Sequence, residues 1–266
     1  MMFEHATTVR RAAVAGMFYP GDEATLRQQL TQLLAGSPTD TQGPPKVLIV
    51  PHAGYVYSGA TAARAYACLK AQRAQIKRVV LLGPAHRVYL QGMALPSVER
   101  FATPLGEVAL DRVALNETAS LPGVVVDDHA HALEHSLEVQ LPFLQTALGD
   151  FALVPVLVGD AAARDVAGVI DALWGGPETL VVVSTDLSHF HDYDAARALD
   201  ARTCDRILAR ATDISGEDAC GARALNGLLG ADHMRDRSIE LLARCNSGDT
   251  AGDRERVVGY GAFVAH

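Results

Sequence analysis

The chain has 266 residues, of which 49% are hydrophobic, and it carries a formal net charge of −8 at pH 7. This acidic balance argues against a phosphate-backbone partner, because nucleic-acid binding needs a basic stripe and the chain has no run of Lys and Arg. The apolar stretches around Leu48 and Val181 are too short to cross a bilayer, and the N-terminus lacks the apolar core of a secretory signal, so we expect a cytoplasmic protein without a membrane partner.

The predicted elements begin with an amphipathic helix over Asp22–Leu34. Its leucines recur at helical spacing behind an aspartate that can cap the helix. Apolar runs rich in β-branched residues follow, and each predicts a buried strand. These runs are Lys46–Val50, Arg78–Leu82, Leu153–Val158 and Leu180–Ser184. Two further strand-like runs, Ser238–Cys245 and Val257–Val264, could pair antiparallel across a polar turn.

Together these elements predict an α/β fold with a mostly parallel, mixed central sheet flanked by helices. Strands that are apolar throughout are typical of parallel sheets, because helices cover both faces of such a sheet. The antiparallel pair near the end of the chain makes the sheet mixed. The chain contains no internal repeat and no low-complexity linker, so we expect residues 1–266 to form a single domain.

Polar side chains follow three of the predicted strands. His52 comes after the first strand, His86 after the second, and Asp186 and His189 after the fourth. Because ligands bind at the carboxyl ends of parallel strands, we expect these loops to converge on one crevice. A lone histidine is more often a structural residue, but three in equivalent positions indicate a metal pocket, since imidazole is the commonest metal ligand at such sites.

Residues 127–144 predict one helix whose first part is rich in histidine. Within it, His131, Glu134 and His135 match the His-x-x-Glu-His pattern of inverted zinc peptidases. In the structural alternative, Glu134 and Glu138 complement the helix dipole and the histidines lie on a solvated face. The pattern leaves both interpretations open for Glu134 and His135, and it favours the structural one for His131.

Cys220 is one of four cysteines, which form no Cys-x-x-Cys pair and should be free thiols. It lies near the start of a helical stretch that runs to Leu229, where the helix dipole favours a thiolate. A lone cysteine is more often a small buried hydrophobe, and its spacing alone assigns Cys220 no further role.

Several short motifs occur in order along nearly the whole chain. They are Ala15-Gly-Met-Phe-Tyr19, Pro51-His-Ala-Gly-Tyr-Val-Tyr-Ser-Gly59, Leu82-Gly-Pro-Ala-His86, Glu134-His-Ser-Leu-Glu138, Ser184-Thr-Asp-Leu-Ser-His189, Ala219-Cys-Gly221 and Gly259-Tyr-Gly-Ala262. With these motifs the chain resembles the Memo family. The resemblance implies a fold similar to that of class III extradiol dioxygenases, which are non-haem iron enzymes that open catechol rings.

The resemblance also implies a role for each pocket residue. His52 and His86 match the two metal-binding histidines of the family, and Cys220 matches the cysteine that takes the place of the dioxygenases' carboxylate ligand. His189 matches the acid/base histidine of the dioxygenases, with Asp186 beside it. Glu134, His135 and Tyr57 match pocket-lining positions, and Met17 and Phe18 stand where some relatives carry a tryptophan at the pocket mouth, which makes Phe18 a candidate substrate contact.

These matches predict a metal-dependent oxidoreductase that binds Fe(II) and a small aromatic or peptide ligand. Copper or zinc are alternatives, because a thiolate is a softer ligand than a carboxylate. The same pocket could instead serve a non-catalytic metal-handling or peptide-binding scaffold, since one fold can host both. A weaker alternative is a zinc peptidase at His131, Glu134 and His135. Bacterial relatives imply an AMMECR1-like protein and a radical S-adenosylmethionine (radical SAM) protein as partners.

Overall fold

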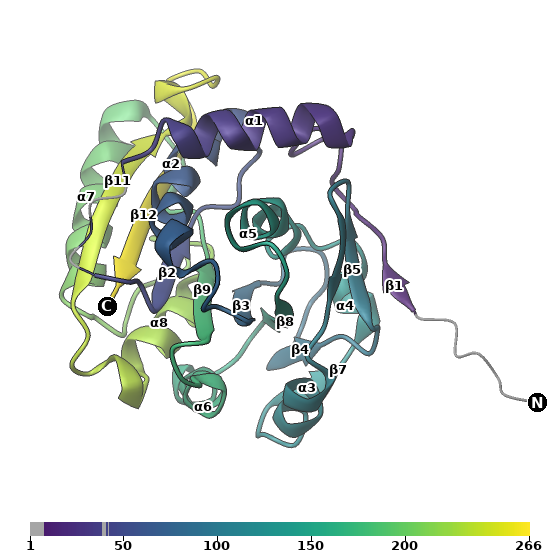
Figure 1. Cartoon of the computed structure of the whole chain (residues 1–266). Helices are drawn as coiled ribbons and strands as arrows, with labels where there is room; N and C mark the ends of the chain where they lie inside the picture. The colour runs from purple at the N-terminus through teal and green to yellow at the C-terminus, as the bar shows by residue number, and fades with distance from the viewer. Residues whose placement is uncertain (1–7, 39–40, 42) are drawn as a thin grey trace, which may run out of the picture.

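A nine-stranded sheet forms the centre of the computed structural model, which describes residues 8–38, 41 and 43–266. Its strands are β2 (Val47–Val50), β3 (Arg78–Pro84), β4 (Met93–Leu95), β7 (Val124–Val126), β8 (Ala152–Val158), β9 (Thr179–Ser184), β10 (His189–His191), β11 (Ile239–Asn246) and β12 (Val257–Ala265). They lie in the order β10-β12-β2-β9-β3-β8-β4-β7, and β11 pairs with β12 (Figure 1). A separate three-stranded sheet contains β1 (Val9–Arg10), β5 (Arg100–Thr103) and β6 (Gly106–Ala109).

The central part of the large sheet is parallel. The four strands predicted first, β2, β9, β3 and β8, are neighbours in this order and all run in the same direction. β12 runs antiparallel to both β2 and β11, and β4 runs antiparallel to β8. The predicted α/β fold with a mixed sheet is therefore confirmed, and so is the predicted pairing of the two C-terminal strands.

Helices flank the sheet on both sides. They are α1 (Glu23–Ala35), α2 (Tyr55–Ala67), α3 (Arg112–Thr118), α4 (Asp128–Ala132), α5 (Leu141–Leu148), α6 (Ala163–Leu173), α7 (Tyr193–Leu208) and α8 (Ala222–Gly230), with short 3-10 helices at Cys68–Gln72, Glu138–Gln140, Asp232–Met234 and Ser247–Asp249. In Figure 1, α1, α2 and α5 lie together on one side of the central strands, and α6 and α8 lie on the other. α1 begins where the sequence predicts, because Asp22 Oδ1 accepts the Thr25 N–H at 2.9 Å.

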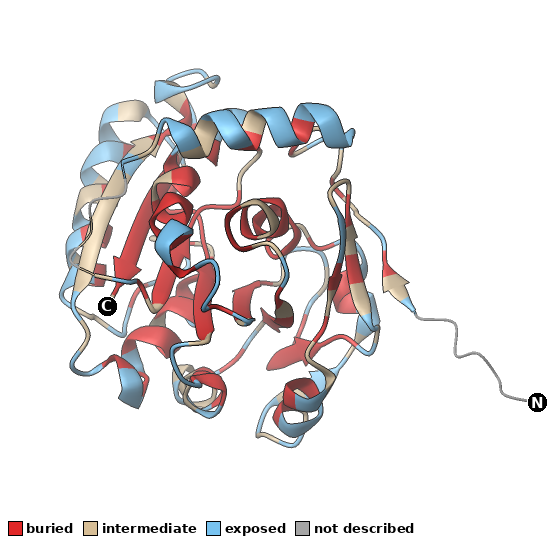
Figure 2. Ribbon diagram, viewed as in Figure 1, coloured by how far each residue is buried: buried red, intermediate tan, exposed pale blue. Residues whose placement is uncertain are grey.

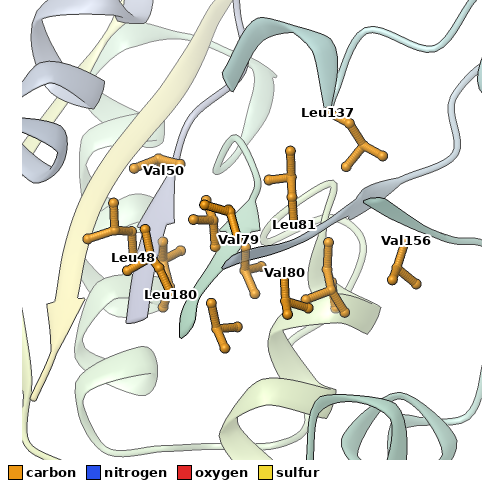
Figure 3. Packing of buried hydrophobic residues seen from close by; sticks show 14 of the residues in the cluster. Leu48, Val50, Val79, Val80, Leu81, Leu137, Val156 and Leu180 are labelled. Carbon is orange, nitrogen blue, oxygen red and sulfur yellow. The ribbon is translucent and has the colours of Figure 1, made fainter. Parts of the chain in front are cut away.

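The central strands pack into a single hydrophobic core. Every residue of β2 and β9 is buried, and Figure 3 shows labelled side chains of these strands, such as Leu48 and Leu180, near those of β3 and β8. Burial of each such Leu or Val stabilises the fold by roughly 1.5–3 kcal/mol. Figure 2 shows the contrast with α1, whose outer side is exposed. One cluster of buried residues extends along the chain from Val14 to Ala265, while the single domain over residues 1–266 stays a prediction.

The predicted single helix over residues 127–144 is wrong. The structure divides this segment into α4, a loop, a short 3-10 helix and α5. Glu134 and Glu138 are not in the first turns of an exposed helix, since their exposed fractions are 2% and 0%. His131 is equally buried, at 2%, so the expected solvated face does not exist at this residue.

Arg10 of β1 accounts for the break in that helix. Its guanidinium donates hydrogen bonds to the carbonyl oxygens of His131 and Glu134 at 2.7 and 2.6 Å, and to the Glu138 carboxylate at 2.6 Å. A continuing helix would use those carbonyls for its own backbone hydrogen bonds. An arginine from a distant strand therefore replaces the helical partners and holds the loop in a non-helical form.

Within the part of the chain that the structure describes, each helix is too short or too polar to span a bilayer. Residues 1–7, on which the expectation of no secretory signal partly depends, lie outside the described residues. The four cysteines are free thiols, as expected.

Candidate metal centre

The candidate metal centre lies at the carboxyl ends of the parallel strands. His52 follows β2, His86 follows β3, and Cys220 comes from the segment before α8. One potential ligand atom from each of these three side chains lies within 4.8 Å of the other two. The structure thus brings together the three residues that the sequence analysis assigned to the metal, because loops at this edge of a parallel sheet meet.

His52 is the most deeply buried of the three. Only 2% of its surface is exposed, its Nδ1 lies 2.9 Å from Ser184 Oγ, and its Nε2 lies 3.3 Å from Cys220 Sγ. Burial, reinforced by the charges of the neighbouring His86 and His135, places the pKa of His52 well below its ordinary value. The imidazole is therefore neutral at pH 7, which is the form that binds metals.

Glu134 fixes the orientation of His86. Its Oε1 lies 3.1 Å from His86 Nδ1, and its Oε2 accepts the backbone N–H of His86 at 2.5 Å. Burial tends to raise the pKa of Glu134, but hydrogen bonds from the His135 and His86 rings and from backbone N–H groups outweigh it and leave the pKa below its ordinary value. A carboxylate accepts the Nδ1 proton of His86, so Nε2 of that ring is left free for a metal.

The structure gives Cys220 a buried-hydrophobe environment rather than the helix start at which a dipole would favour a thiolate. α8 begins at Ala222, after the cysteine. Burial, with the adjacent charge of Asp186, raises the pKa of the Cys220 thiol to about 12, although nearby N–H groups and the Thr185 hydroxyl oppose the shift. A thiol with this pKa is protonated at pH 7, and a bound cation would displace its proton. The metal-free thiol is therefore not readily oxidised.

Asp186 and His189 lie beside the three potential ligands. Asp186 is 4% exposed, its Oδ1 accepts the backbone N–H of His52 at 2.7 Å, and its Oδ2 lies 4.0 Å from His52 Nε2. Burial raises the pKa of Asp186 to about 6, although backbone hydrogen bonds and the charge of His189 oppose the shift. His189 is partly exposed at the start of β10, and its charge affects the pKa of both His52 and Asp186.

His135 and Phe18 form a wall of the site. The ring of His135 stacks on His86 with centroids 4.8 Å apart and meets His52 edge-on at 5.4 Å. Phe18 packs against His135, with ring centroids 4.8 Å apart. Tyr57 lies in the first turn of α2 and is 37% exposed, but no ring contact among the described residues joins it to these histidines.

His131 belongs to a different part of the structure. Its Nε2 lies 3.0 Å from the Ala94 carbonyl oxygen, and among the described residues it joins neither group of potential metal ligands, although His86, Glu134 and His135 form one. The zinc-peptidase interpretation requires His131 and His135 to face one ion from the same helix. Because α4 ends between them, the sequence pattern does not produce that geometry.

A cavity of about 570 Å³ adjoins Cys220. It lies between the ends of β3 and β8 and the start of α8, and it includes Asp160 and Arg223, which form an ion pair at 2.7 Å. This volume is in the range of small-molecule sites. Cys220 lines this cavity, whereas His52 and His86 are not among its lining residues.

The sequence did not reveal the residues whose hydrogen bonds hold the potential ligands and their loops in place. Ser184 and Gln140 support His52, and Arg10 with Glu138 supports the loop that carries Glu134. The only sequence signal for Ser184 is its position at the end of a predicted strand, just before Asp186. Arg10 lies in a short strand with no periodicity that would have marked it.

A family model and the sequences of curated proteins match almost the whole chain. The family model described as "Memo-like protein" matches residues 10–264. A MEMO1 family protein of Aquifex aeolicus is 35% identical over 270 residues, covering 95% of this chain and 97% of that protein. A MEMO1 family protein of Ignicoccus hospitalis is 35% identical over 285 residues, covering 96% and 97%. The crystal structure of an uncharacterized Escherichia coli K12 protein covers 82% of this chain and 98% of its own, with 13% identity and a TM-score of 0.49.

Proposed function

The chain belongs to the Memo family, and from this premise we propose that it binds a transition metal through His52, His86 and Cys220. The observation that carries the proposal is the approach of three potential ligand atoms, from three separate segments, to within 4.8 Å of one another. Two imidazole nitrogens and a thiolate suit iron, copper or zinc. Of these we expect Fe(II), as the resemblance to the dioxygenases implies.

The protonation of the three side chains supports this assignment. Both histidine rings have Nδ1 within 3.1 Å of a hydrogen-bonding partner, and the pKa of His52 is lowered by burial so that its ring is neutral. Burial and the charge of Asp186 raise the pKa of the Cys220 thiol, and a bound cation would stabilise the thiolate in place of its proton. The donor set therefore fits a divalent metal.

We further propose that the metal-loaded protein is an oxidoreductase acting on a small aromatic compound. A bound iron or copper ion would supply Lewis acidity and one-electron chemistry. Phe18 packs against His135 beside the potential ligands, and the separate cavity that Cys220 lines has room for a small molecule. In this proposal His189 and the Asp186 carboxylate, which lies 4.0 Å from His52 Nε2, accept or return a proton.

Metal content of anaerobically purified protein tests the metal proposal. We expect near-stoichiometric iron in the wild type by elemental analysis, and its loss in the triple variant His52→Ala, His86→Ala, Cys220→Ser. The matched control is Cys245→Ser, which changes a cysteine of similar exposure that is bonded to Thr61 outside the centre. Absence of metal from the wild type, even after anaerobic reconstitution with Fe(II), would contradict the proposal.

Oxygen uptake then tests the oxidoreductase. Wild-type protein with bound metal should consume oxygen in the presence of a catechol, and the triple variant should not. Stoichiometric metal without turnover of any catechol would instead favour the non-catalytic metal-handling scaffold, which uses the same ligands. An AMMECR1-like protein and a radical SAM protein remain the predicted partners.

A further inference from the structure

We propose that Ser184 is a positioning residue that holds His52 in the tautomer with the proton on Nδ1, so that Nε2 faces the metal centre without a proton. This inference rests on the proposed function, since it concerns how one metal ligand is prepared for binding. The inference is based on the hydrogen bonds of the buried Ser184 hydroxyl group, because only one assignment of donors and acceptors satisfies all of them.

The Ser184 hydroxyl has three close partners. Its Oγ lies 2.9 Å from His52 Nδ1, 2.6 Å from the Ser136 carbonyl oxygen and 2.9 Å from Gln140 Nε2. Ser184 is the last residue of β9 and has no exposed surface. A hydroxyl group has one proton to donate and two lone pairs to accept with, so these three contacts use its full capacity.

The contact with Gln140 uses one of the two lone pairs. Gln140 Nε2 also lies 2.9 Å from the Pro51 carbonyl oxygen, which only accepts, so the amide must present its NH₂ group there. The second hydrogen of that NH₂ group is then donated to Ser184 Oγ. The other end of the amide is consistent with this orientation, because Gln140 Oε1 accepts the Tyr66 hydroxyl at 2.8 Å.

The contact with Ser136 uses the proton. A carbonyl oxygen only accepts, so the 2.6 Å contact between two oxygens requires the Ser184 hydroxyl to donate to it. One lone pair of Ser184 Oγ remains, and it faces His52 Nδ1. The histidine must therefore donate from Nδ1. In the other tautomer, two lone pairs would face each other at 2.9 Å, or the buried Ser136 carbonyl would lose its donor.

A proton on His52 Nδ1 leaves the other ring nitrogen, Nε2, without one. His52 Nε2 lies 3.3 Å from Cys220 Sγ, at the centre of the three potential ligands. Only an unprotonated ring nitrogen can bind a metal, and its identity is set by the hydrogen bond of the other nitrogen. Ser184 thus does for His52 what the Glu134 carboxylate does for His86.

Nuclear magnetic resonance of the metal-free full-length chain reads the tautomer directly. In ¹⁵N-labelled, chelator-treated wild type at pH 7.5, we expect His52 to show a protonated Nδ1 and an unprotonated Nε2. Ser184→Ala removes the acceptor and should shift the population toward a proton on Nε2. Ser184→Thr keeps the hydroxyl and should restore the wild-type pattern. Ser188→Ala is the matched control, because Ser188 is equally buried and, among the described residues, its hydroxyl makes no bond to a histidine ring.

Binding of Zn²⁺, measured by competition with a chromophoric chelator, provides the second readout. Ser184→Ala should weaken binding roughly 10–100-fold relative to wild type, as is typical for partners of metal-bound histidines, and Ser184→Thr should largely restore it. Ser188→Ala should bind like the wild type.

The outcomes separate this inference from the proposed function. A wild-type His52 with its proton on Nε2 overturns the inference, even if Ser184→Ala fails to fold. An unchanged tautomer in folded Ser184→Ala also overturns it, as does a changed tautomer with undiminished Zn²⁺ affinity. If the wild type binds no metal while the tautomers behave as expected, the proposed function fails and the assignment of the Nδ1 proton by Ser184 stands.

Discussion

Glu134, in the loop after α4, and Glu138, at the start of the following 3-10 helix, are both buried, but their surroundings differ. Glu138 accepts hydrogen bonds from the Arg10 guanidinium and the Tyr19 hydroxyl, each at 2.6 Å, and from two backbone N–H groups. Glu134 instead has the rings of His86 and His135 as neighbours, at 3.1 and 3.2 Å. The partners of a buried carboxylate therefore decide its role. An arginine from a distant strand makes Glu138 structural, whereas imidazoles make Glu134 part of the site.

Breaking the Arg10–Glu138 pair should have the largest effect. Arg10→Met leaves a buried carboxylate without its cation, so we expect the free energy of unfolding to fall by about 3–5 kcal/mol in denaturant titrations. Arg27→Met is the matched control, because Arg27 pairs with Glu23 on the surface, with 55% and 61% of the two side chains exposed. Its stability should change little. Equal losses in the two variants would show that the buried pair has no special role.

Acid should weaken the same region through His131, whose carbonyl oxygen accepts from Arg10. Burial lowers the pKa of His131 to about 4. The unfolded chain, with an ordinary pKa near 6.5, then binds the proton first, so stability falls as the pH drops from about 6.5 to 4. The loss attributable to this group is on the order of 3 kcal/mol.

Denaturant titrations at pH 7.5 and 4.5 measure that loss. His131→Gln should show a flatter dependence on pH than the wild type, whereas His129→Gln, which changes the exposed neighbour, should keep the wild-type dependence. A His131→Gln profile parallel to that of the wild type would place the acid sensitivity elsewhere. Metal content should be retained in His131→Gln, in contrast to what a zinc peptidase at this residue requires.

Substitution of Glu134 should have the smallest energetic effect of these changes. Glu134→Gln removes the charge that orients His86, and we expect Zn²⁺ affinity to fall roughly 10–100-fold. The loss of stability should be smaller than in Arg10→Met. Glu117→Gln, on an exposed helical surface, is the control. If Glu134→Gln kept the wild-type Zn²⁺ affinity but lost much of its stability, Glu134 would be a structural carboxylate like Glu138.

The parallel strands and the residues after them could be predicted because their signal is local. A run such as Leu180–Ser184 is apolar and β-branched throughout, which indicates a strand buried on both faces. Once such strands are recognised, the position of a polar residue at their carboxyl ends follows from the geometry of parallel sheets. His52 and His86, which follow β2 and β3, accordingly lie at one edge of the sheet.

The contacts behind the ligands could not be predicted, because they join residues far apart in the chain. Arg10 and Glu138 are separated by 128 positions, and His52 and Ser184 by 132, with no periodicity linking either pair. Local rules also failed where tertiary burial opposes them. The helix-dipole argument for Cys220 predicts a lowered pKa, whereas burial raises it. The strands of the small sheet are two to four residues long, which is too short for a reliable pattern.

His52 and Cys220 are separated by 168 positions and meet only in the folded chain. In the unfolded ensemble, bringing the three donors together requires closing long loops, so an ion would have little affinity for that state. Because the ion would bind the folded state and hardly the unfolded state, a higher metal concentration would raise the free energy of unfolding. A free ion at one hundred times its dissociation constant would add about 2.7 kcal/mol to the folded state. The melting temperature of this chain would thus depend on metal concentration, and a chelator would lower it without changing a single residue.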